Sequence, residues 1–329
     1  MHFGHPCIRQ ANSIFTMRTA IIGAGRKRNG IGPYIGKYFQ KNGAEVVSVL
    51  ATSPETAQKA AAALGAYGIN AASYADFAAM MRAERPEAVV IASPARTHHD
   101  YIVKCLDHGV HIFCEKPFIW EGPAGNGVTA RLEPIFAQAR QKGCKIAMNS
   151  QWPFSLPFYE ALCGPVNPET AETFSIRLSP VVSGLEMIPD AVPHALSILY
   201  RVFGAGEIQH LSIRADGGKT DAMTIDFRYT SACGFCQSRV ELVQTLRQPR
   251  DFAYGFNGRI ARRAIDSTNY RISFVYEDRA VPVQDPLELS VRDFLAAVRE
   301  NREPAVEYRH IQNNMELLTK IDDAACKNF

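Results

Sequence analysis

Strand-like and helix-like segments alternate through the first 148 residues of this chain, and that alternation limits the folds open to it. Short apolar runs rich in valine and isoleucine are each followed by an amphipathic or alanine-rich segment. The expected strands are Arg18–Ile22, Glu45–Ala51, Asn70–Ala72, Ala88–Ala92, Val110–Cys114 and Lys145–Met148. The expected helices are Pro33–Lys41, Pro54–Leu64, Tyr74–Arg82, His99–Asp107 and Val128–Lys142. This βαβα order predicts a parallel, doubly wound sheet with right-handed crossovers.

Beyond Asn149 the pattern changes, and strand-like runs follow one another with few helices between them. The expected strands are Thr173–Leu178, Ile208–Arg214, Met223–Tyr229, Ser238–Gln244 and Tyr270–Tyr276. The expected helices are Ala191–Phe203, Asp293–Arg299 and Ile311–Asp323. Consecutive strands that lack helical crossovers favour a mostly antiparallel sheet. The sequence therefore predicts a Rossmann domain, with a doubly wound parallel sheet, over residues 17–148 and an α+β domain on a mostly antiparallel open sheet over residues 149–329.

Composition places the chain among ordinary globular proteins. Its 329 residues are enough for two domains, and 47% of them are hydrophobic and 21% charged. The formal net charge of +3 is too small to indicate a nucleic-acid or membrane partner. No run approaches the ~18 apolar residues that a membrane-spanning helix needs. Residues 1–16 lack an apolar core, so we interpret them as a flexible N-terminal extension and not as a secretory signal.

The eight cysteines are spread along the chain without a disulfide framework. In a long chain without a signal segment they are typical of reduced thiols, so we expect a cytoplasmic protein. Cys233 and Cys236 form one C-x-x-C, but no second pair accompanies them. Residues three apart on a strand point to opposite faces. We therefore expect no metal site.

A glycine loop follows the first expected strand. Gly23 would allow a tight turn there, and Gly25 would let the backbone approach a pyrophosphate. The third glycine of this fingerprint is displaced by an insertion, so either Gly30 or Gly32 takes its role. The helix that begins near Pro33 would offer its N-terminal amides to the phosphates. The loop therefore predicts a dinucleotide-binding site.

The end of the second strand bears on which dinucleotide binds. NAD-specific Rossmann folds usually place an acid there to bind the ribose 2′-hydroxyl. This chain has Thr52 and Ser53 after Ala51, with no acid before Glu55. These hydroxyls, together with the basic loop residues 26–28, could accept a 2′-phosphate. The pattern favours NADP and leaves NAD open.

A lysine follows the fifth strand in the sequence Glu115-Lys116-Pro117. Because a proline disfavours helical geometry in the residue before it, Lys116 is expected to be extended. The carboxyl ends of the strands form the edge at which open α/β sheets bind their ligands. We therefore expect Lys116 to face the reacting centre.

These residues resemble the Gfo/Idh/MocA oxidoreductase family over residues 17 to about 325. The resemblance is carried by the Gly23 and Gly25 turn, by the Ser93-Pro94 pair with His98 four residues later, and by Glu115-Lys116-Pro117. It implies an NAD(P)-dependent oxidoreductase that moves a hydride between nicotinamide and a small sugar, polyol or related carbonyl or alcohol substrate.

The resemblance also implies roles for particular residues. Besides the glycine loop, the residues expected at the cofactor are Ser93, Pro94, His98, Glu115 and Lys116. The family's second-domain motif, an aspartate with a histidine four residues later, matches Asp190 and His194. With Lys116 they form the expected catalytic group. The family also implies that the second domain binds substrate and mediates a homodimer or homotetramer.

The chemistry of alcohol oxidation suits these side chains. A histidine such as His194 can take the hydroxyl proton, because its ordinary pKa is near 6.5. Lys116 could stabilise alkoxide character on the same oxygen, and Asp190 could orient the imidazole or a substrate hydroxyl. Asp190 also sits where the N-cap of the expected helix Ala191–Phe203 belongs, so a structural role stays open for it.

A purely structural role also stays open for three other residues. His98 could cap or pack at the start of a helix, and Glu115 could be a satisfied strand-end carboxylate. Trp152 follows the last strand of the first domain, where it could pack against nicotinamide or substrate or belong to the interdomain core.

Two other functions remain possible from the sequence. One is an NAD(P)H-dependent imine reductase, in which Lys116 or His194 donates the proton. The other is a non-catalytic dinucleotide-binding regulatory protein. Arg177, Arg239 and Tyr254 are candidates for reading the substrate, although no spacing supports them.

Overall fold

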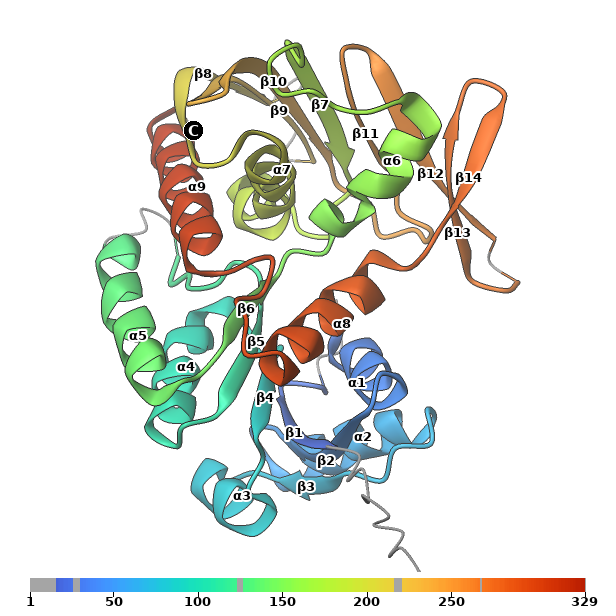
Figure 1. The fold of residues 1–329 in the computed structure, drawn as a ribbon. Helices are drawn as coiled ribbons and strands as arrows, with labels where there is room; N and C mark the ends of the chain where they lie inside the picture. Colours follow the sequence, from blue (N-terminus) through green and yellow to red (C-terminus); the bar gives the residue numbers. More distant parts are fainter. Residues whose placement is uncertain (1–15, 26–29, 123–126, 216–220, 267, 329) are drawn as a thin grey trace, which may run out of the picture.

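The computed structural model describes residues 16–25, 30–122, 127–215, 221–266 and 268–328. The expected extension, residues 1–16, lies almost entirely outside these ranges. The chain forms two sheets, each with its own helices (Figure 1). Among the described residues, no helix has the length and apolar character required to cross a membrane.

The first sheet is parallel and has six strands, as the alternating pattern predicts. Its strands are β1 (Met17–Ile22), β2 (Ala44–Leu50), β3 (Ala72–Tyr74), β4 (Ala88–Ile91), β5 (His111–Glu115) and β6 (Ile146–Asn149). The helices among them are α1 (Gly32–Lys41), α2 (Pro54–Gly65), α3 (Phe77–Glu84), α4 (His98–Asp107) and α5 (Val128–Lys142). The strand order β3-β2-β1-β4-β5-β6 reverses direction at β1. This switch point opens a crevice at the carboxyl ends of β1 and β4, where such folds bind ligands.

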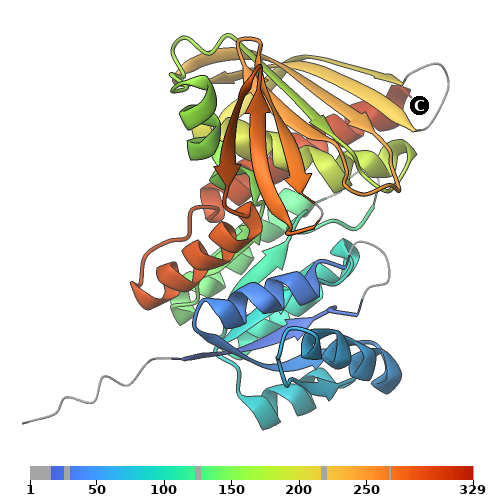
Figure 2. The ribbon, with the colours of Figure 1, turned by 90° about the vertical axis from the view of Figure 1, so that its right-hand side faces the viewer.

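The second sheet has eight strands and is antiparallel except where β7 pairs with β10. Its strands are β7 (Thr173–Leu178), β8 (Gly206–Ala215), β9 (Ala222–Ser231), β10 (Gly234–Val243), β11 (Phe252–Phe256), β12 (Arg259–Asp266), β13 (Arg271–Tyr276) and β14 (Arg279–Val283). The helices α6 (Leu156–Cys163), α7 (Met187–Phe203) and α9 (Tyr308–Asn328) pack against this sheet. Figure 2 shows the sheet from the side, above the layers of the first domain. The predicted fold class is confirmed.

Two parts of the sequence-based prediction are incomplete or wrong. The elements α6, β11, β12 and β14 were not among those expected from the sequence. It also placed the start of α7 four residues too late, because Pro189 and Pro193 look like signals of a helix start. The N-cap is Glu186, so Asp190 lies within the first turns of α7. The expectation that Asp190 is an N-cap is therefore wrong.

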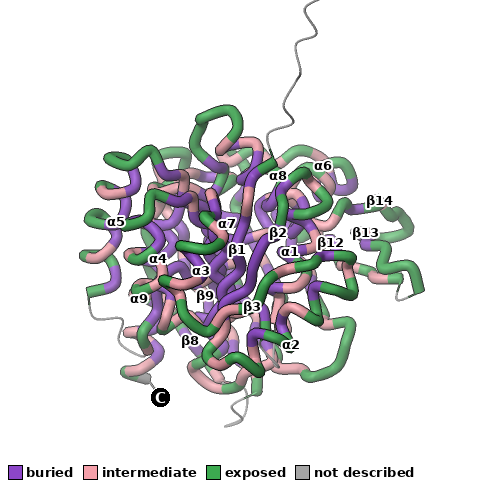
Figure 3. Tube along the Cα trace, turned by 90° about the horizontal axis from the view of Figure 1, so that it is seen from below, coloured by how far each residue is buried: buried purple, intermediate pink, exposed green. Residues whose placement is uncertain are grey.

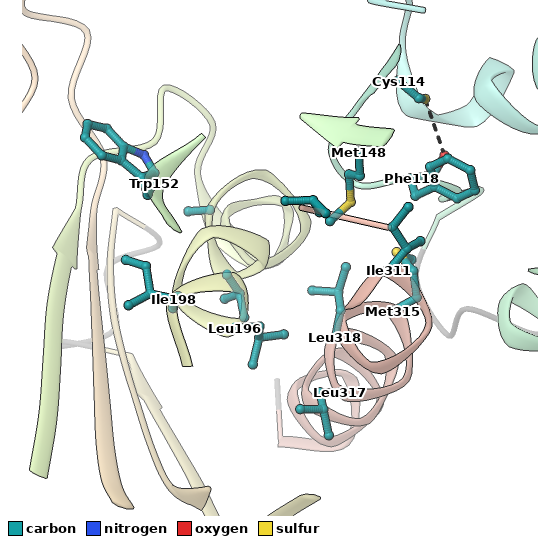
Figure 4. Packing of buried hydrophobic residues seen from close by; sticks show 14 of the residues in the cluster. Cys114, Phe118, Met148, Trp152, Leu196, Ile198, Ile311, Met315, Leu317 and Leu318 are labelled. Atoms are coloured by element: carbon teal, nitrogen blue, oxygen red, sulfur yellow. Dashed lines mark hydrogen bonds between the residues drawn. The ribbon is translucent and has the colours of Figure 1, made fainter. Parts of the chain in front are cut away.

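The hydrophobic core runs without interruption from one sheet to the other. Figure 4 shows Leu196 of α7 and Leu318 of α9 in the same cluster as Met148 of β6. Seen from below, the buried stretches of the chain concentrate in the strands of the first sheet, inside a rim of exposed helices and loops (Figure 3). The two domains are therefore packed together and not merely tethered.

Helix α8 (Pro286–Arg299) follows the last strand of the second sheet but packs on the first domain, beside α1 (Figure 1). The ring of Phe294 lies 5.9 Å from that of Phe39 and 5.4 Å from that of Phe113. The Tyr38 hydroxyl donates to Asp285 Oδ2 at 2.5 Å just before the helix begins. By packing, the first domain thus extends beyond the expected boundary at residue 148.

Candidate active site

A cleft of about 670 Å³ lies between the carboxyl edge of the first sheet and the second domain. This volume is within the usual range for small-molecule sites. The first domain contributes Gly30, Glu115, Lys116 and Asn149, and the second contributes Asp190, His194, Arg250 and Arg263. Ligand sites commonly form where two domains face each other in this way.

Lys116 reaches across the cleft to the second domain. Its Nζ donates to Asp190 Oδ1 at 3.0 Å and also to the Asp190 carbonyl oxygen. The Lys116 side chain is 14% exposed and that of Asp190 is 27% exposed. A lysine ammonium has three N–H donors, so two are used here and one remains for a ligand in the cleft. The lysine is thus anchored at the end of β5 and oriented by α7.

The charge state of Asp190 follows from this pair. Burial alone would raise the pKa of its carboxyl group, but the ammonium of Lys116 and its hydrogen bond hold the pKa below the ordinary 3.8. Asp190 is therefore an anion at neutral pH and balances the lysine in the cleft.

His194 lies one helical turn after Asp190, on the same face of α7. Its Nδ1 is 3.5 Å from the Ser150 hydroxyl oxygen. Its ring and that of Trp152 form a T-shaped pair with centroids 6.5 Å apart. Burial, and secondarily the positive charge of Lys116, lower the pKa of His194 well below 6.5. The imidazole is consequently neutral at physiological pH and able to accept a proton.

Three residues line the cleft beside this group. Asn149 Nδ2 donates to Glu115 Oε1, while Asn149 Oδ1 is buried and has no hydrogen-bond partner among the described residues. Trp152 is 5% exposed and stacks on Phe252 of β11, with centroids 3.5 Å apart. Trp152 thus belongs to the cleft wall and to the interdomain core at once. Asn149 Oδ1 is therefore a hydrogen-bond acceptor available to a bound ligand.

The glycine positions fit a dinucleotide. Gly23 has φ +90°, and a Cβ there would lie 2.5 Å from the Ser93 backbone. A Cβ on Gly32, the first residue of α1, would lie 2.7 Å from Ala24 Cα, and one on Gly25 would lie 3.1 Å from the Thr56 carbonyl oxygen. Gly32 therefore provides the close packing of helix on strand that the third glycine of the fingerprint requires, and Gly30 lines the cleft.

The residues expected to choose between NAD and NADP are only partly described. The Ser53 hydroxyl forms a capping box with Thr56 at the start of α2, so it serves the helix. Thr52, beside it, is exposed. Arg26, Lys27 and Arg28 lie outside the described residues.

The structure places His98 behind the cleft and not on its wall. The side chain is 1% exposed; Nε2 lies 2.9 Å from the Ser93 carbonyl oxygen, and Nδ1 lies 3.0 Å from that of Pro117. The ring thereby ties the Ser93-Pro94 turn to the segment that carries Lys116. Its geometry is that of a structural residue.

The sequence-based substrate candidates lie elsewhere. Arg177 and Arg239 are exposed and pair with Glu241 and Asp226, and Tyr254 is fully buried, with its hydroxyl 3.0 Å from that of Ser155. None of the three lines the cleft. Arg250 and Arg263 do line it. Neither was expected from the sequence, because a loop position and a strand register cannot be predicted from residue spacing.

The structure offers no metal centre in its described part, where no group of three or more His, Cys, Asp or Glu side chains could hold an ion. Cys233 is exposed, whereas Cys236 is buried on β10, so the two side chains do not face a common site.

Comparison with known proteins agrees with this geometry. Residues 17–150 match the model of a family, Gfo/Idh/MocA, that is described as an oxidoreductase family with an NAD-binding Rossmann fold. A D-glucoside 3-dehydrogenase of Escherichia coli (strain K12) is 33% identical over 110 residues, 33% of this chain and 30% of that protein. An inositol 2-dehydrogenase of Ralstonia nicotianae is 36% identical over 76 residues, 23% of this chain and 22% of that protein. The matched segments thus span about a third or less of these relatives' length.

Likeness in three dimensions extends over nearly the whole chain. The structure of UDP-N-acetylglucosamine 3-dehydrogenase from Acidithiobacillus ferrooxidans superposes with a TM-score of 0.69 at 20% identity. The match covers 94% of this chain and 99% of that one. At this identity the likeness establishes the fold of both domains.

Proposed function

We propose that the chain, whose residues 17–150 match the Gfo/Idh/MocA oxidoreductase family, is an NAD(P)-dependent dehydrogenase or reductase. Its substrate would be a small sugar, polyol or related alcohol or carbonyl compound. The dehydrogenases of glucosides and inositol that resemble its first domain support this class.

The proposed cofactor site follows the glycine loop. When bound, the nicotinamide accepts or donates the hydride. Gly23 and Gly32 allow close packing at the end of β1 and the start of α1, and Gly25 would let the backbone approach the pyrophosphate there. Gly30, Glu115 and Asn149 line the cleft where the rest of the cofactor would lie, and Asn149 Oδ1 has no hydrogen-bond partner among the described residues.

The proton chemistry is assigned to Lys116, Asp190 and His194. We assign His194 Nε2 to take the substrate hydroxyl proton, since Nδ1 faces the Ser150 hydroxyl. The remaining N–H of Lys116 would hydrogen-bond the same oxygen and stabilise its developing negative charge. Asp190 would hold the ammonium in place and keep the net charge of the pair near zero.

One observation carries this proposal more than any other. Lys116 comes from β5 of the first domain and His194 from α7 of the second, yet both lie in one cleft with Asp190 paired to the lysine. A purely regulatory protein has no need for a neutral histidine beside a buried lysine at a dinucleotide site.

We further propose that NADP is the preferred cofactor and that the protein works as a homodimer or homotetramer. The exposed Thr52 and the lack of an acid between Ala51 and Glu55, at the end of β2, support the first point. The family resemblance supports the second.

The test begins with fluorescence titration of the purified protein with NADPH and NADH, followed by a screen of polyols, sugars and imines with the tighter-binding cofactor. We expect NADPH to bind and polyols or sugars to be turned over. Failure of both dinucleotides to bind would reject the proposal. Binding without turnover of any of the three classes would favour a regulatory role, and turnover of imines alone would favour an imine reductase.

A further inference from the structure

Two arginines of the second domain line the cleft without forming an ion pair with any described carboxylate. Arg250 lies in the loop before β11, and Arg263 lies on β12. Neither takes part in any ion pair within the described part of the chain. Cationic side chains that lose water on burial are usually paired, so an unpaired couple inside a cleft calls for a ligand.

Arg263 is held firmly in position. Its guanidinium lies 5.4 Å from the centroid of the Trp152 ring and 5.7 Å from that of Phe252. One Nη donates to the Arg250 carbonyl oxygen, while Nε is buried and has no hydrogen-bond partner in the described residues. Burial lowers the pKa of Arg263 from its ordinary value. The group is therefore a preorganised cation with donor capacity to spare.

The carboxylates nearest to Arg263 do not satisfy it. Asp285 already accepts from the Tyr38 hydroxyl and from the Leu287 amide, at 2.5 and 3.0 Å. Asp251 is exposed and lies beyond ion-pair distance. The second arginine, Arg250, is close enough to His194 and Asp190 for its charge to act on both, but Asp190 is already paired with Lys116. The two guanidinium groups thus extend the site from the catalytic group toward β12.

We propose that Arg250 and Arg263 bind an oxyanion of the substrate, a carboxylate or a phosphate, beside the oxygen handled by Lys116 and His194. This inference rests on the proposed function and narrows its substrate class to acidic sugars, sugar phosphates or their polyol counterparts. Arginine binds both kinds of oxyanion through paired N–H donors. The phosphates of the dinucleotide are another source of the same chemistry, but their place is at the glycine loop and the start of α1, on the first domain.

Kinetics with matched substrates tests the proposal. Each pair shares a carbon skeleton: an aldohexose and its uronic acid, or a polyol and its monophosphate, with NADP⁺ or NAD⁺. We expect the anionic member to have the higher kcat/KM by about tenfold or more, as for a charge-assisted hydrogen bond in a cleft. In Arg263→Met the KM of the anionic member should rise by a similar factor relative to the KM of the neutral member. Arg263→Lys should recover part of the preference.

The chain offers a matched control in Arg262, which is exposed on the opposite face of β12. Arg262→Met should keep the preference for anionic substrates. An equal kcat/KM for the two members of each pair in the parent protein would overturn the proposal. A rise in the NADPH Kd of Arg263→Met, with anionic and neutral substrates affected alike, would assign the arginines to the cofactor phosphates and overturn it as well.

A binding experiment separates this inference from the proposed function. The chain has two tryptophans, and the ring centroid of Trp152 lies 5.4 Å from the guanidinium of Arg263. Quenching of its emission by gluconate or a hexose phosphate, with NADPH present, requires no turnover. Saturable quenching in the parent and in Arg262→Met, but not in Arg263→Met, supports the anion site even if no substrate is oxidised. No quenching, together with turnover of neutral polyols, would leave the dehydrogenase proposal standing and reject the anion site.

Discussion

The ammonium of Lys116 and the carboxylate of Asp190, 3.0 Å apart, join β5 of the first domain to α7 of the second inside the cleft. The pair therefore has two effects: it neutralises a partly buried lysine, and it fixes that lysine beside His194. Removing either partner leaves the other charge partly buried and unpaired, which is costlier than losing the pair as a whole.

Replacement of the lysine is the most direct test of the mechanism. We expect Lys116→Met to lower kcat by about 100-fold or more, because the variant loses the donor that stabilises the substrate oxygen. NADPH binding should change little. Lys142→Met, at an exposed position on α5, should leave both quantities unchanged. Steady-state kinetics and NADPH titration measure the two, and a kcat within a few-fold of the parent would rule out the assigned role.

The pH dependence of kcat/KM should shift in opposite directions when either of the two charges beside His194, on Lys116 or on Asp190, is removed. Because its pKa is lowered well below 6.5, the imidazole is neutral above that pH, and kcat/KM should fall only at more acidic pH. Lys116 lowers the pKa of His194 and Asp190 raises it. The acid limb should therefore move to higher pH in Lys116→Met and to lower pH in Asp190→Asn. Limbs that move together, or not at all, would exclude His194 as the base.

Two glycine-to-alanine changes should have opposite effects on stability. In Gly32→Ala the new Cβ would meet Ala24 Cα at 2.7 Å, so we expect a loss of about 1–3 kcal/mol in the free energy of unfolding and weaker NADPH binding. Gly65, at the end of α2, has open space around it, and Gly65→Ala should gain about 0.5–1 kcal/mol. Urea denaturation and NADPH titration of the two variants provide the comparison. An equal change in the free energy of unfolding in the two variants would mean that helix α1 does not need its close approach to Ala24.

His310 should make the protein sensitive to acid. Burial lowers its pKa to about 3, while the unfolded chain binds the proton near 6.5. The unfolded state thus holds more protons between these values, and stability should fall as pH drops through this interval, by at most about 1.4 kcal/mol per pH unit from this group. In His310→Phe, which keeps a ring stacked on Tyr200, the slope should be shallower. The exposed His108→Gln serves as the control, and identical slopes in all three proteins would contradict the prediction.

The architecture could be predicted from the sequence because it follows from patterns among neighbouring residues. Strand β4, inside the first sheet, is a continuous apolar run, which is what burial on both faces demands, and each strand of this sheet was predicted to within a few residues. The position of Lys116 at the cleft followed from the proline after it and from the end of a parallel strand. These are properties of neighbouring residues, so a single sequence contains them.

Features that depend on distant contacts were not predictable. Arg263 belongs to an arginine-rich strand with a weak apolar alternation, and its place in the cleft depends on its pairing with Phe274 of β13. The start of α7 was placed too late because Pro189 and Pro193 look like signals of a helix start. In the structure, Ile188 and Pro189 are buried, and that packing supports the earlier turn of the helix.

Helix α8 has a consequence for how the chain can be divided. After it, the chain returns to the first sheet, where the Met148 amide donates to the Val306 carbonyl oxygen at 3.2 Å. In topological terms, residues 150–284 are therefore an insertion within a dinucleotide-binding unit that is completed only by α8. A fragment ending at residue 149 would lack Phe294, whose ring packs against those of Phe39 and Phe113. A chain in which a short linker replaces residues 150–284 would retain this packing.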